Sequence, residues 1–375
     1  LMALTKVDQT MVSDQVFGRR NLIINGDMRV AQRGTSSTSV SSGGDYLTID
    51  RFRFSMSSAG TWDISRSATV PSGEGFAFSQ KIDCTTADSS LDAANYLIYL
   101  TALEGQNLQH TKFGTSSAEK LTLSFWVRSA KTGTYVVEFI NSAAGGTRTQ
   151  SQSYTISSAD TWEKKTITID GDTVRAFDNT TDAELSLYFW LAAGSNYTGG
   201  TLNTSWNSST NANRAAGLVN LADSTSNDWY ITGIQLEIGD NATPFEHLSY
   251  GEVLSLCHRY CFAACPAGEA GSGASNVQIG IGSFYTDTQI ETVVHFPTTM
   301  RSSPTLSSNS GSSYFISETN AGGQGFNSWT GVYGAGKSQK LIYSSGTVSD
   351  FNNQGMATRL AVQNSAAYVI FEAEI

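Results

Sequence analysis

The chain has 375 residues, more than one ordinary domain needs, so two domains are the natural expectation. Gly is abundant (35 residues), Pro is scarce (5), and only 15 % of the residues are charged. The net charge of −10 disfavours binding to a nucleic-acid backbone, which needs clustered Lys and Arg.

The first twenty residues are polar with scattered apolar side chains, and they lack the apolar core and cleavage site of a secretory signal. No apolar run approaches the roughly 18–20 residues of a membrane-spanning helix. Four cysteines, three of them clustered, indicate no disulfide framework. We therefore expect synthesis in a reducing cytosol without membrane insertion. Residues 1–20 are expected to dock to a partner or to lead into a trimer, with a disordered leader as the alternative.

Short apolar runs separated by Gly, Ser, Asn and Asp follow, a pattern typical of all-β sandwiches and barrels. Roughly eight to ten strands over residues 21–248 predict a jelly-roll β-sandwich. The expected strands are Asn21–Asp27, Ile49–Phe54, Phe76–Ile82, Ala94–Leu100, Leu121–Val127, Tyr135–Ile140, Trp162–Ile169, Leu185–Leu191 and Trp229–Ile238.

A connecting helix is expected at residues 249–266. Ser249 and Glu252 form a capping-box pattern, and Pro266 stops the run, so we predict a helix over Ser249–Cys265. Further short strands then predict a smaller C-terminal β-sandwich domain, the head, at residues 267–375. These strands are Val277–Phe284, Ile290–Phe296, Ser313–Ile316, Gln339–Tyr343, Arg359–Val362 and Ala366–Ala373. The predicted fold class is all-β.

The predicted helix carries Cys257, Cys261 and Cys265 four residues apart, with His258 beside them. One helical ladder cannot surround a tetrahedral zinc ion, so buried apolar thiols are the preferred interpretation. No sequence motif for acyl transfer, metalloprotease chemistry or phosphate binding occurs. The sequence contains 33 acidic residues, too many for the pattern to select a catalytic carboxylate pair. We predict no metal, no cofactor and no enzymatic activity.

Aromatic side chains are the better candidates for ligand contact, because an aromatic ring can stack on the apolar face of a sugar. Trp126 and Trp190 lie on the strand faces opposite the aliphatic residues, although burial in the core is the alternative for each. Trp206 lies in the long polar segment Asn196–Asp228, and a loop of that length is often functional or mobile. In the head, the candidates alternate with Gly, Ser and Asn: Tyr314, Phe326, Trp329 and Tyr333, with Trp329 preferred.

The pair formed by Asn21–Asp27 and Trp229–Ile238 resembles the ends of a jelly-roll carbohydrate-binding module. Such modules often hold calcium, but Arg29 and Thr232–Gly233 stand where that family's acids are expected, so no metal site is predicted. A longer set of motifs resembles tail fibres of tailed bacteriophages: Asn21–Arg33 (NLIINGDMRVAQR), Asp50–Phe52, Thr243–Tyr260 (TPFEHLSYGEVLSLCHRY) and Phe296–Pro304 (FPTTMRSSP).

The second resemblance implies a receptor-binding protein of the virion that attaches to the host surface by binding envelope glycan, commonly as a homotrimer. Residues 1–20 would then dock to other tail proteins, and the head would recognise the glycan. Two alternatives remain open. One is a tailspike depolymerase that cleaves polysaccharide, and the other is a structural virion protein, such as a capsid decoration or fibre spacer.

Overall fold

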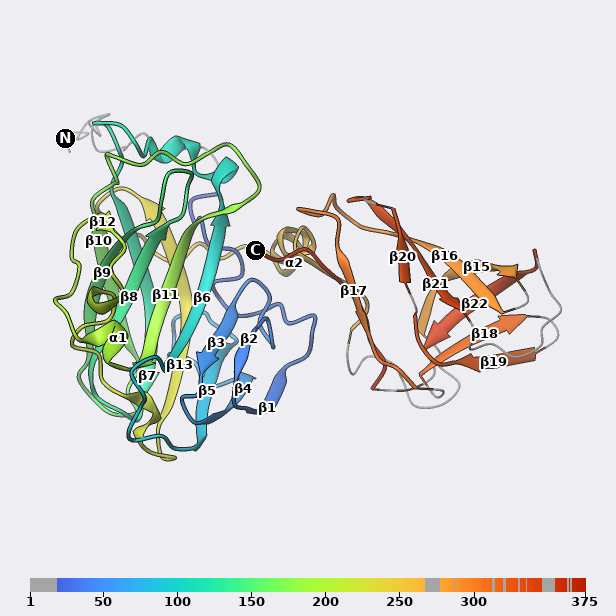
Figure 1. Cartoon of the computed structure of the whole chain (residues 1–375), viewed down its shortest axis with the longest axis horizontal. Helices are drawn as coiled ribbons and strands as arrows, with labels where there is room; N and C mark the ends of the chain where they lie inside the picture. The colour runs from blue at the N-terminus through green and yellow to red at the C-terminus, as the bar shows by residue number, and fades with distance from the viewer. Residues whose placement is uncertain are drawn as a thin grey trace, which may run out of the picture.

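The computed structural model describes residues 19–266, 277–286, 288–311, 314–319, 322–329, 331–334, 336–345, 355–362, 364 and 366–375. Residues 1–18 of the expected docking segment lie outside this range. Figure 1 shows a large β-lobe and a smaller one joined at a waist, where helix α2 and the C-terminus lie. The expected all-β fold, a jelly-roll sandwich followed by a helix and a smaller β-domain, is confirmed.

The large lobe, the body, consists of two sheets that pack face to face. Sheet A has the order β1 (Ser36–Val40), β4 (Thr61–Ser67), β5 (Ser79–Thr86), β13 (Asp228–Ile238), β7 (Leu121–Ser129), β10 (Glu163–Ile169). Sheet B has the order β12 (Asn207–Ser208), β9 (Arg148–Ile156), β8 (Gly133–Asn141), β11 (Ala183–Ala193), β6 (Tyr96–Glu104), β3 (Arg53–Ser57), β2 (Gly43–Asp45). Short helices occupy the connections: η1 (Gly105–Asn107), η2 (Gln109–Thr111), α1 (Ser195–Thr198), η3 (Asn211–Asn213) and η4 (Leu221–Asp223).

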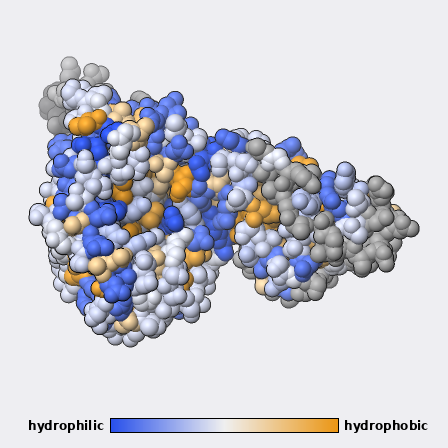
Figure 2. Space-filling view, viewed as in Figure 1, coloured by the Kyte–Doolittle hydropathy of each residue, from blue (hydrophilic) through white to orange (hydrophobic). Residues whose placement is uncertain are grey.

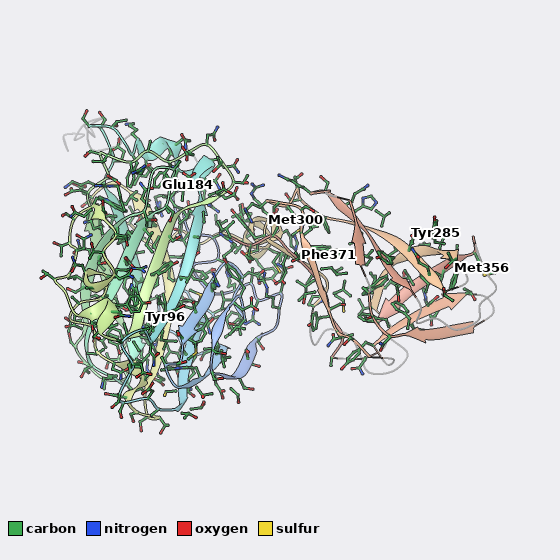
Figure 3. All side chains as sticks on the ribbon, in the orientation of Figure 1. Tyr96, Glu184, Tyr285, Met300, Met356 and Phe371 are labelled. Atoms are coloured by element: carbon green, nitrogen blue, oxygen red, sulfur yellow. The ribbon has the colours of Figure 1, made fainter. Side chains whose placement is uncertain are left out.

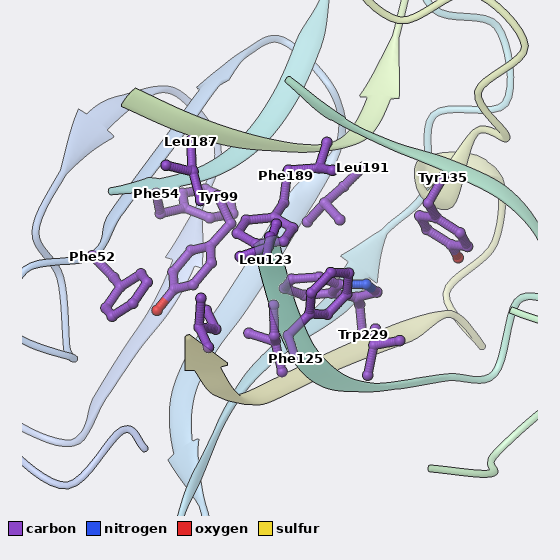
Figure 4. Close-up of a cluster of buried hydrophobic side chains, with 14 of the residues drawn as sticks. Phe52, Phe54, Tyr99, Leu123, Phe125, Tyr135, Leu187, Phe189, Leu191 and Trp229 are labelled. Atoms are coloured by element: carbon purple, nitrogen blue, oxygen red, sulfur yellow. The ribbon is translucent and has the colours of Figure 1, made fainter. Parts of the chain in front are cut away.

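The core between the sheets follows from the period-2 alternation of β7 and β11. Leu121, Leu123, Phe125 and Val127 of β7 face Leu185, Leu187, Phe189 and Leu191 of β11, and all eight are fully buried. The Phe125 and Phe189 rings meet edge to face at 5.3 Å, and Trp229 and Tyr99 fill the space beside them (Figure 4). Each such side chain contributes about 1.5–3 kcal/mol through burial.

The opening segment Asn21–Asp27 is not a strand, contrary to the prediction, but it does close the body against β13. The Leu22 amide donates to the Leu236 carbonyl at 2.9 Å. The buried Asn21 side chain donates to the Ile234 carbonyl and accepts from the Leu236 amide. The Ile234 amide also donates to the Gly26 carbonyl at 2.9 Å, so scattered backbone bonds and the Asn21 side chain replace a continuous ladder at the part of β13 that β5 does not pair with. The two ends of the body therefore meet, as the sequence pattern indicated.

Helix α2 covers Tyr250–His258 and starts with the predicted capping box, in which the Glu252 amide donates to the Ser249 side chain and the Ser249 amide donates to the Glu252 side chain. The prediction that it continues to Cys265 is wrong. Cys261–Cys265 forms strand β14, which pairs with β23 (Val369–Glu372), and β23 also pairs with β17 (Thr305–Ser308) to make sheet C. Residues 261–265 form a strand because β23 pairs with their backbone N–H and C=O groups, and because Phe262 stacks on Phe371.

The head contains sheet D, with the order β19 (Gly322–Phe326), β18 (Phe315–Thr319), β22 (Ala357–Val362), β15 (Val277–Thr286), β16 (Gln289–His295), β21 (Gln339–Ser345), β20 (Gly331–Tyr333). Sheets C and D share one hydrophobic cluster that includes Phe284, Phe315 and Phe371. Figure 3 places Met300 and Phe371 near the waist and Tyr285 and Met356 at the far end of the head.

Charged side chains cross the waist between body and head. Arg33 of the body bonds Glu372 at 2.6 Å and Glu374 at 3.1 Å, and Arg51 also pairs with Glu374. Hydrophilic residues accordingly gather at the waist in Figure 2. Gln32 of the body also donates to the Cys261 carbonyl at 2.7 Å, and Arg301 of the head donates to the Thr181 carbonyl at 3.1 Å, so the head is attached through several contacts rather than a single linker.

Candidate functional site

The outer face of sheet B is covered by the long polar segment that follows β11. Tyr197, Leu202 and Leu218 of this segment pack on a buried cluster that includes Trp190. The Ser151 amide donates to the Asn203 carbonyl at 2.7 Å, and the Val219 amide donates to the Thr134 carbonyl at 2.9 Å. The segment thus forms a fixed cover, which removes this face from contact with a large ligand.

Trp190 is a core residue under this cover, so its predicted role in ligand contact is wrong. Its side chain is fully buried, and its indole nitrogen donates to Glu138 at 3.0 Å. Burial raises the pKa of the Glu138 carboxyl, and the Arg214 guanidinium at 2.8 Å offsets part of that effect. The indole N–H of Trp190 therefore provides a hydrogen bond to the buried Glu138 carboxylate, and the ring does not face solvent.

Sheet A retains an open outer face, and Trp126 lies on it. Trp126 projects from β7 between Lys164 of β10 and Thr232 of β13, the residues directly opposite in the two neighbouring strands. The indole is half-buried, unlike that of Trp190. Of the two predicted tryptophans on the body's outward strand faces, this one is available for contact.

Trp126 lines a groove of about 410 Å³, within the usual range of about 300–1,000 Å³ for ligand sites. Three further rings form its wall. Phe76 and Phe245 meet edge to face at 5.1 Å, and His247 lies 5.3 Å from Phe76 and 4.9 Å from Phe245. The groove therefore presents four rings, contributed by β7, the segment before β5, and the segment after β13.

Gly233 allows this wall to form. It lies in a β-bulge of β13, between Thr232 and Gln235, with φ at +63°. A Cβ atom at this position would lie 2.6 Å from Cζ of Phe76, closer than real contacts allow. Glycine is thus required both for the backbone conformation and for the approach of the ring.

The segment Thr243–His247 is held over β13 by buried polar residues. The Thr243 amide donates to Glu237 at 3.0 Å, and the Glu246 amide donates to the Gln235 side chain at 2.8 Å. Glu237 and Gln235 are both fully buried, so these bonds fix the position of Phe245 and His247. The aromatic wall is preorganised by the body itself.

Polar groups complete the groove: Ser124, Lys164, Glu74 and Thr243. Together with the rings they provide stacking surfaces beside hydrogen-bond donors and acceptors of both charge signs. This combination suits a neutral, hydroxyl-rich and partly apolar ligand, whose ring faces can stack while its hydroxyls bond the rim.

The next row of sheet A is less open. Tyr230 is 7 % exposed because the Arg128 guanidinium lies 4.8 Å from its ring centroid. Arg128 is held by Asp160 at 2.7 Å, and the Trp162 ring meets Tyr230 edge to face at 6.1 Å. Burial, with Asp228 nearby, raises the pKa of the Tyr230 hydroxyl. None of Tyr230, Arg128 and Trp162 lines the groove, so this row does not extend it.

The predicted contact residues of the head lie mainly in its core. Trp329 is 7 % exposed and Phe326 is 1 % exposed, and their rings meet at 5.1 Å. Their burial in the cluster shared by sheets C and D contradicts the prediction that these two residues contact a ligand. Tyr314 packs half-buried against the same cluster. Tyr333 lies on β20, and its side chain is outside the described residues.

Trp206 of the body is half-buried against the core. Its indole nitrogen donates to the Asp170 carbonyl at 2.7 Å, and its ring meets Phe113 at 5.9 Å. The structure therefore separates Trp206 from Trp126, and it unites Trp126 with Phe76, Phe245 and His247, which sequence reasoning missed. The one sequence signal was Phe245, a large apolar residue in an otherwise polar stretch.

The thiols are structural within the described residues. Cys84, Cys257 and Cys261 are free thiols, and these three and Cys265 are buried. Burial raises the pKa values of the Cys257 and Cys261 thiols well above their usual range. In the described part of the chain, no group of three or more His, Cys, Asp or Glu side chains is placed to hold a metal ion. No helix there is long and apolar enough to cross a membrane.

No family model matches the sequence, and a search of curated proteins finds no match. Among solved structures, the chain is similar to the enzymatically active domain of tailspike protein 4 of bacteriophage CBA120, with 10 % identity, a TM-score of 0.31 and coverage of 58 % of this chain and 21 % of that one. The chain thus spans about a fifth of the tailspike domain's length.

Two carbohydrate-binding modules are similar over a comparable share of the chain. One is the family 11 module from Clostridium thermocellum, in complex with a β-1,3-1,4-mixed-linked tetrasaccharide; it has 10 % identity, a TM-score of 0.27 and coverage of 56 % and 99 % of the two chains. The other is TmCBM61 with β-1,4-galactotriose, at 10 % identity, a TM-score of 0.28 and coverage of 59 % and 99 %. These identities and TM-scores are too low to carry a functional argument for this chain.

Proposed function

We propose that this protein is a tail-fibre receptor-binding protein of a tailed bacteriophage, and that the groove around Trp126 binds envelope glycan of the host. The observation that carries the glycan part is the preorganised wall of Phe76, Phe245 and His247 facing Trp126, with a polar rim. The tail-fibre part is supported by the resemblance of Asn21–Arg33 and Thr243–Tyr260 to such fibres.

The groove lies in the body, so the body rather than the head is the proposed glycan-binding part. The protein acts by adhesion in this proposal, without cleaving its ligand, and it is located in the virion. Self-association into a homotrimer would place three grooves on one fibre. Multivalent engagement then converts weak binding at each groove into firm attachment. Sedimentation of the purified protein tests the trimer.

Replacing Trp126 with Ala tests the glycan-binding role. The variant should lose about fivefold or more in apparent affinity on an array of bacterial surface polysaccharides, because loss of a stacking ring costs on the order of 1 kcal/mol or more. Trp162→Ala is the matched control, since Trp162 lies near the same sheet but does not line the groove. If Trp126→Ala and the wild type bind all polysaccharides equally, the groove is not the glycan site.

An assay of polysaccharide cleavage distinguishes the depolymerase alternative from the proposed adhesion role. Incubation of the wild type with each polysaccharide that it binds should release no new reducing ends. A time-dependent increase in reducing ends would instead identify an enzyme. A spacer or decoration protein would bind no polysaccharide on the array, and adsorption of particles carrying Trp126→Ala would equal that of the wild type.

Point variants are preferable to deletion of the head for these tests. Removal of residues 267–375 would also remove Glu372 and Glu374, the partners of Arg33 and Arg51. Both arginine side chains are at most 7 % exposed. Loss of buried partners is strongly destabilising, so a headless protein would confuse loss of function with loss of folding.

A further inference from the structure

A second cavity, of about 610 Å³, lies at the waist, where the body, helix α2 and the head meet. The opening segment contributes Arg19, the η1–η2 region contributes Asn107 and His110, α2 contributes Leu256, and the head contributes Thr298. Ligand sites occur preferentially at such domain junctions, and this volume fits a small organic molecule. The cavity is separate from the Trp126 groove, and the two share no lining residue.

The cavity lining contains arginines but no acidic residue. Of these arginines, Arg259 already has a partner. It donates to both oxygens of Glu104, at 2.7 and 2.6 Å. Glu104 also accepts from the Tyr260 hydroxyl and from Gln106 at 2.7 Å. The Glu104 carboxylate therefore has its acceptor capacity filled, and it cannot compensate a second guanidinium.

Arg19 is the cation without such a partner. Its Nη1 atom is buried with no hydrogen-bond partner, and its Nη2 atom makes only a long bond, 3.4 Å, to the Leu22 carbonyl. No ion pair within 4 Å joins it to a carboxylate among the described residues. Burial lowers the pKa of the Arg19 guanidinium, with Glu246 among the groups that oppose this effect. A cation removed from water without a counterion is costly, and an anion in the cavity would offset that cost.

The other lining groups suit an anion that carries hydroxyls. Asn107, His110 and Thr298 offer hydrogen-bonding side chains, while Leu22 and Leu256 offer apolar surface. We propose that the waist cavity binds a small carboxylate-bearing molecule, of the size of an acidic monosaccharide, with Arg19 as its carboxylate-binding residue. The proposal is independent of glycan binding at the Trp126 groove.

Titration calorimetry of the full chain with glucuronic acid tests this site, with glucose as the uncharged analogue and inorganic phosphate as the non-sugar anion. Glucuronic acid should bind and glucose should not, because the carboxylate provides the pairing charge. Arg19→Gln should weaken binding at least tenfold, since a charge-assisted bidentate contact is lost. Arg19→Lys should restore part of it, and Lys120→Gln, an exposed site remote from the lining, should change nothing.

Three results would overturn the proposal. Glucuronic acid could fail to bind the wild type, or it could bind Arg19→Gln as well as it binds the wild type. Phosphate could bind as tightly as glucuronic acid, which would make the site a general anion site.

Discussion

Arg259 of the α2 C-terminus and Glu104 at the end of β6 are joined by two hydrogen bonds, of 2.7 and 2.6 Å, across the waist. The Glu104 side chain is fully buried, and that of Arg259 is 28 % exposed. The planar guanidinium matches the carboxylate at both oxygens, so the pair fixes direction as well as distance. The pair therefore fixes the orientation of the C-terminal end of α2 relative to β6 of the body.

We expect Glu104→Gln to destabilise the folded chain by about 2 kcal/mol at neutral pH, since it leaves Arg259 without its counterion in a partly buried site. Urea denaturation monitored by tryptophan fluorescence measures the change. Lys112→Gln, which removes an exposed partner of Glu119, is the control and should stay within about 0.5 kcal/mol of the wild type. Similar stability of both variants would contradict a structural role for the pair.

The same carboxylate predicts a dependence on pH. Burial by itself raises the pKa of Glu104, but the hydrogen bonds from Arg259 and Tyr260 outweigh it and lower that pKa. The folded protein then binds this proton less tightly than the unfolded chain, whose glutamate pKa is about 4.3. The stabilisation is thus present above about pH 4.3 and lost as the pH falls through the folded pKa.

Wild type should therefore lose more unfolding free energy than Glu104→Gln when the pH is lowered from 6 to about 3.5. Urea titrations of both proteins at the two pH values provide the comparison. Equal losses in the two proteins would show that the Glu104 proton is not linked to folding.

Gly233→Ala should distort the groove wall. The new methyl group would lie 2.6 Å from Phe76 Cζ, and the positive φ adds about 1–2 kcal/mol of backbone strain. Glycan affinity should fall together with stability. Gly217→Ala is the matched control, because Gly217 also has a positive φ but no atom within 4 Å of the added Cβ. Array binding measures the loss of glycan affinity, and thermal unfolding measures the loss of stability. Equal glycan affinity in both variants would contradict the proposed wall.

Trp329→Ala should destabilise the head by about 3–5 kcal/mol, as expected for a buried tryptophan packed on Phe315 and Phe326. Calorimetric unfolding should show the loss. Polysaccharide binding by the Trp126 groove should not change at a temperature where the body is folded. A variant of wild-type stability with weakened glycan binding would return Trp329 to the list of contact residues.

Ser249→Ala should cost about 1 kcal/mol, because the hydroxyl accepts from the Glu252 amide at the start of α2. Denaturant unfolding measures it, and Ser255→Ala, in the middle of the same helix, is the control. Since α2 starts directly after the segment that carries Phe245 and His247, Ser249→Ala should also increase amide exchange there. Unchanged exchange at residues 243–247 would show that the cap and the groove wall are independent.

Alternation within the sequence was sufficient to predict the strands that form the core. Leu121, Leu123, Phe125 and Val127 have one strand face to themselves, and burial of that face is the largest favourable term in folding. The capping box at Ser249 could also be predicted, because it depends only on two residues three positions apart. Strands without this signal were missed. β9, with the sequence RTQSQSYTI, buries Thr149, Gln150 and Ser151, whose polar groups bond the covering segment.

Only the tertiary structure decided what the outward faces do. Trp126 and Trp190 occupy equivalent positions in their strand patterns, yet one lines an open groove and the other is buried beneath the polar segment between β11 and β13. Similarly, Cys261–Cys265 continues a helical pattern, but β23, about a hundred residues later in the chain, makes it a strand. Local sequence fixes which side chains are apolar. It cannot fix which distant segment covers them, because that choice depends on packing and hydrogen bonds that form only once the chain is folded.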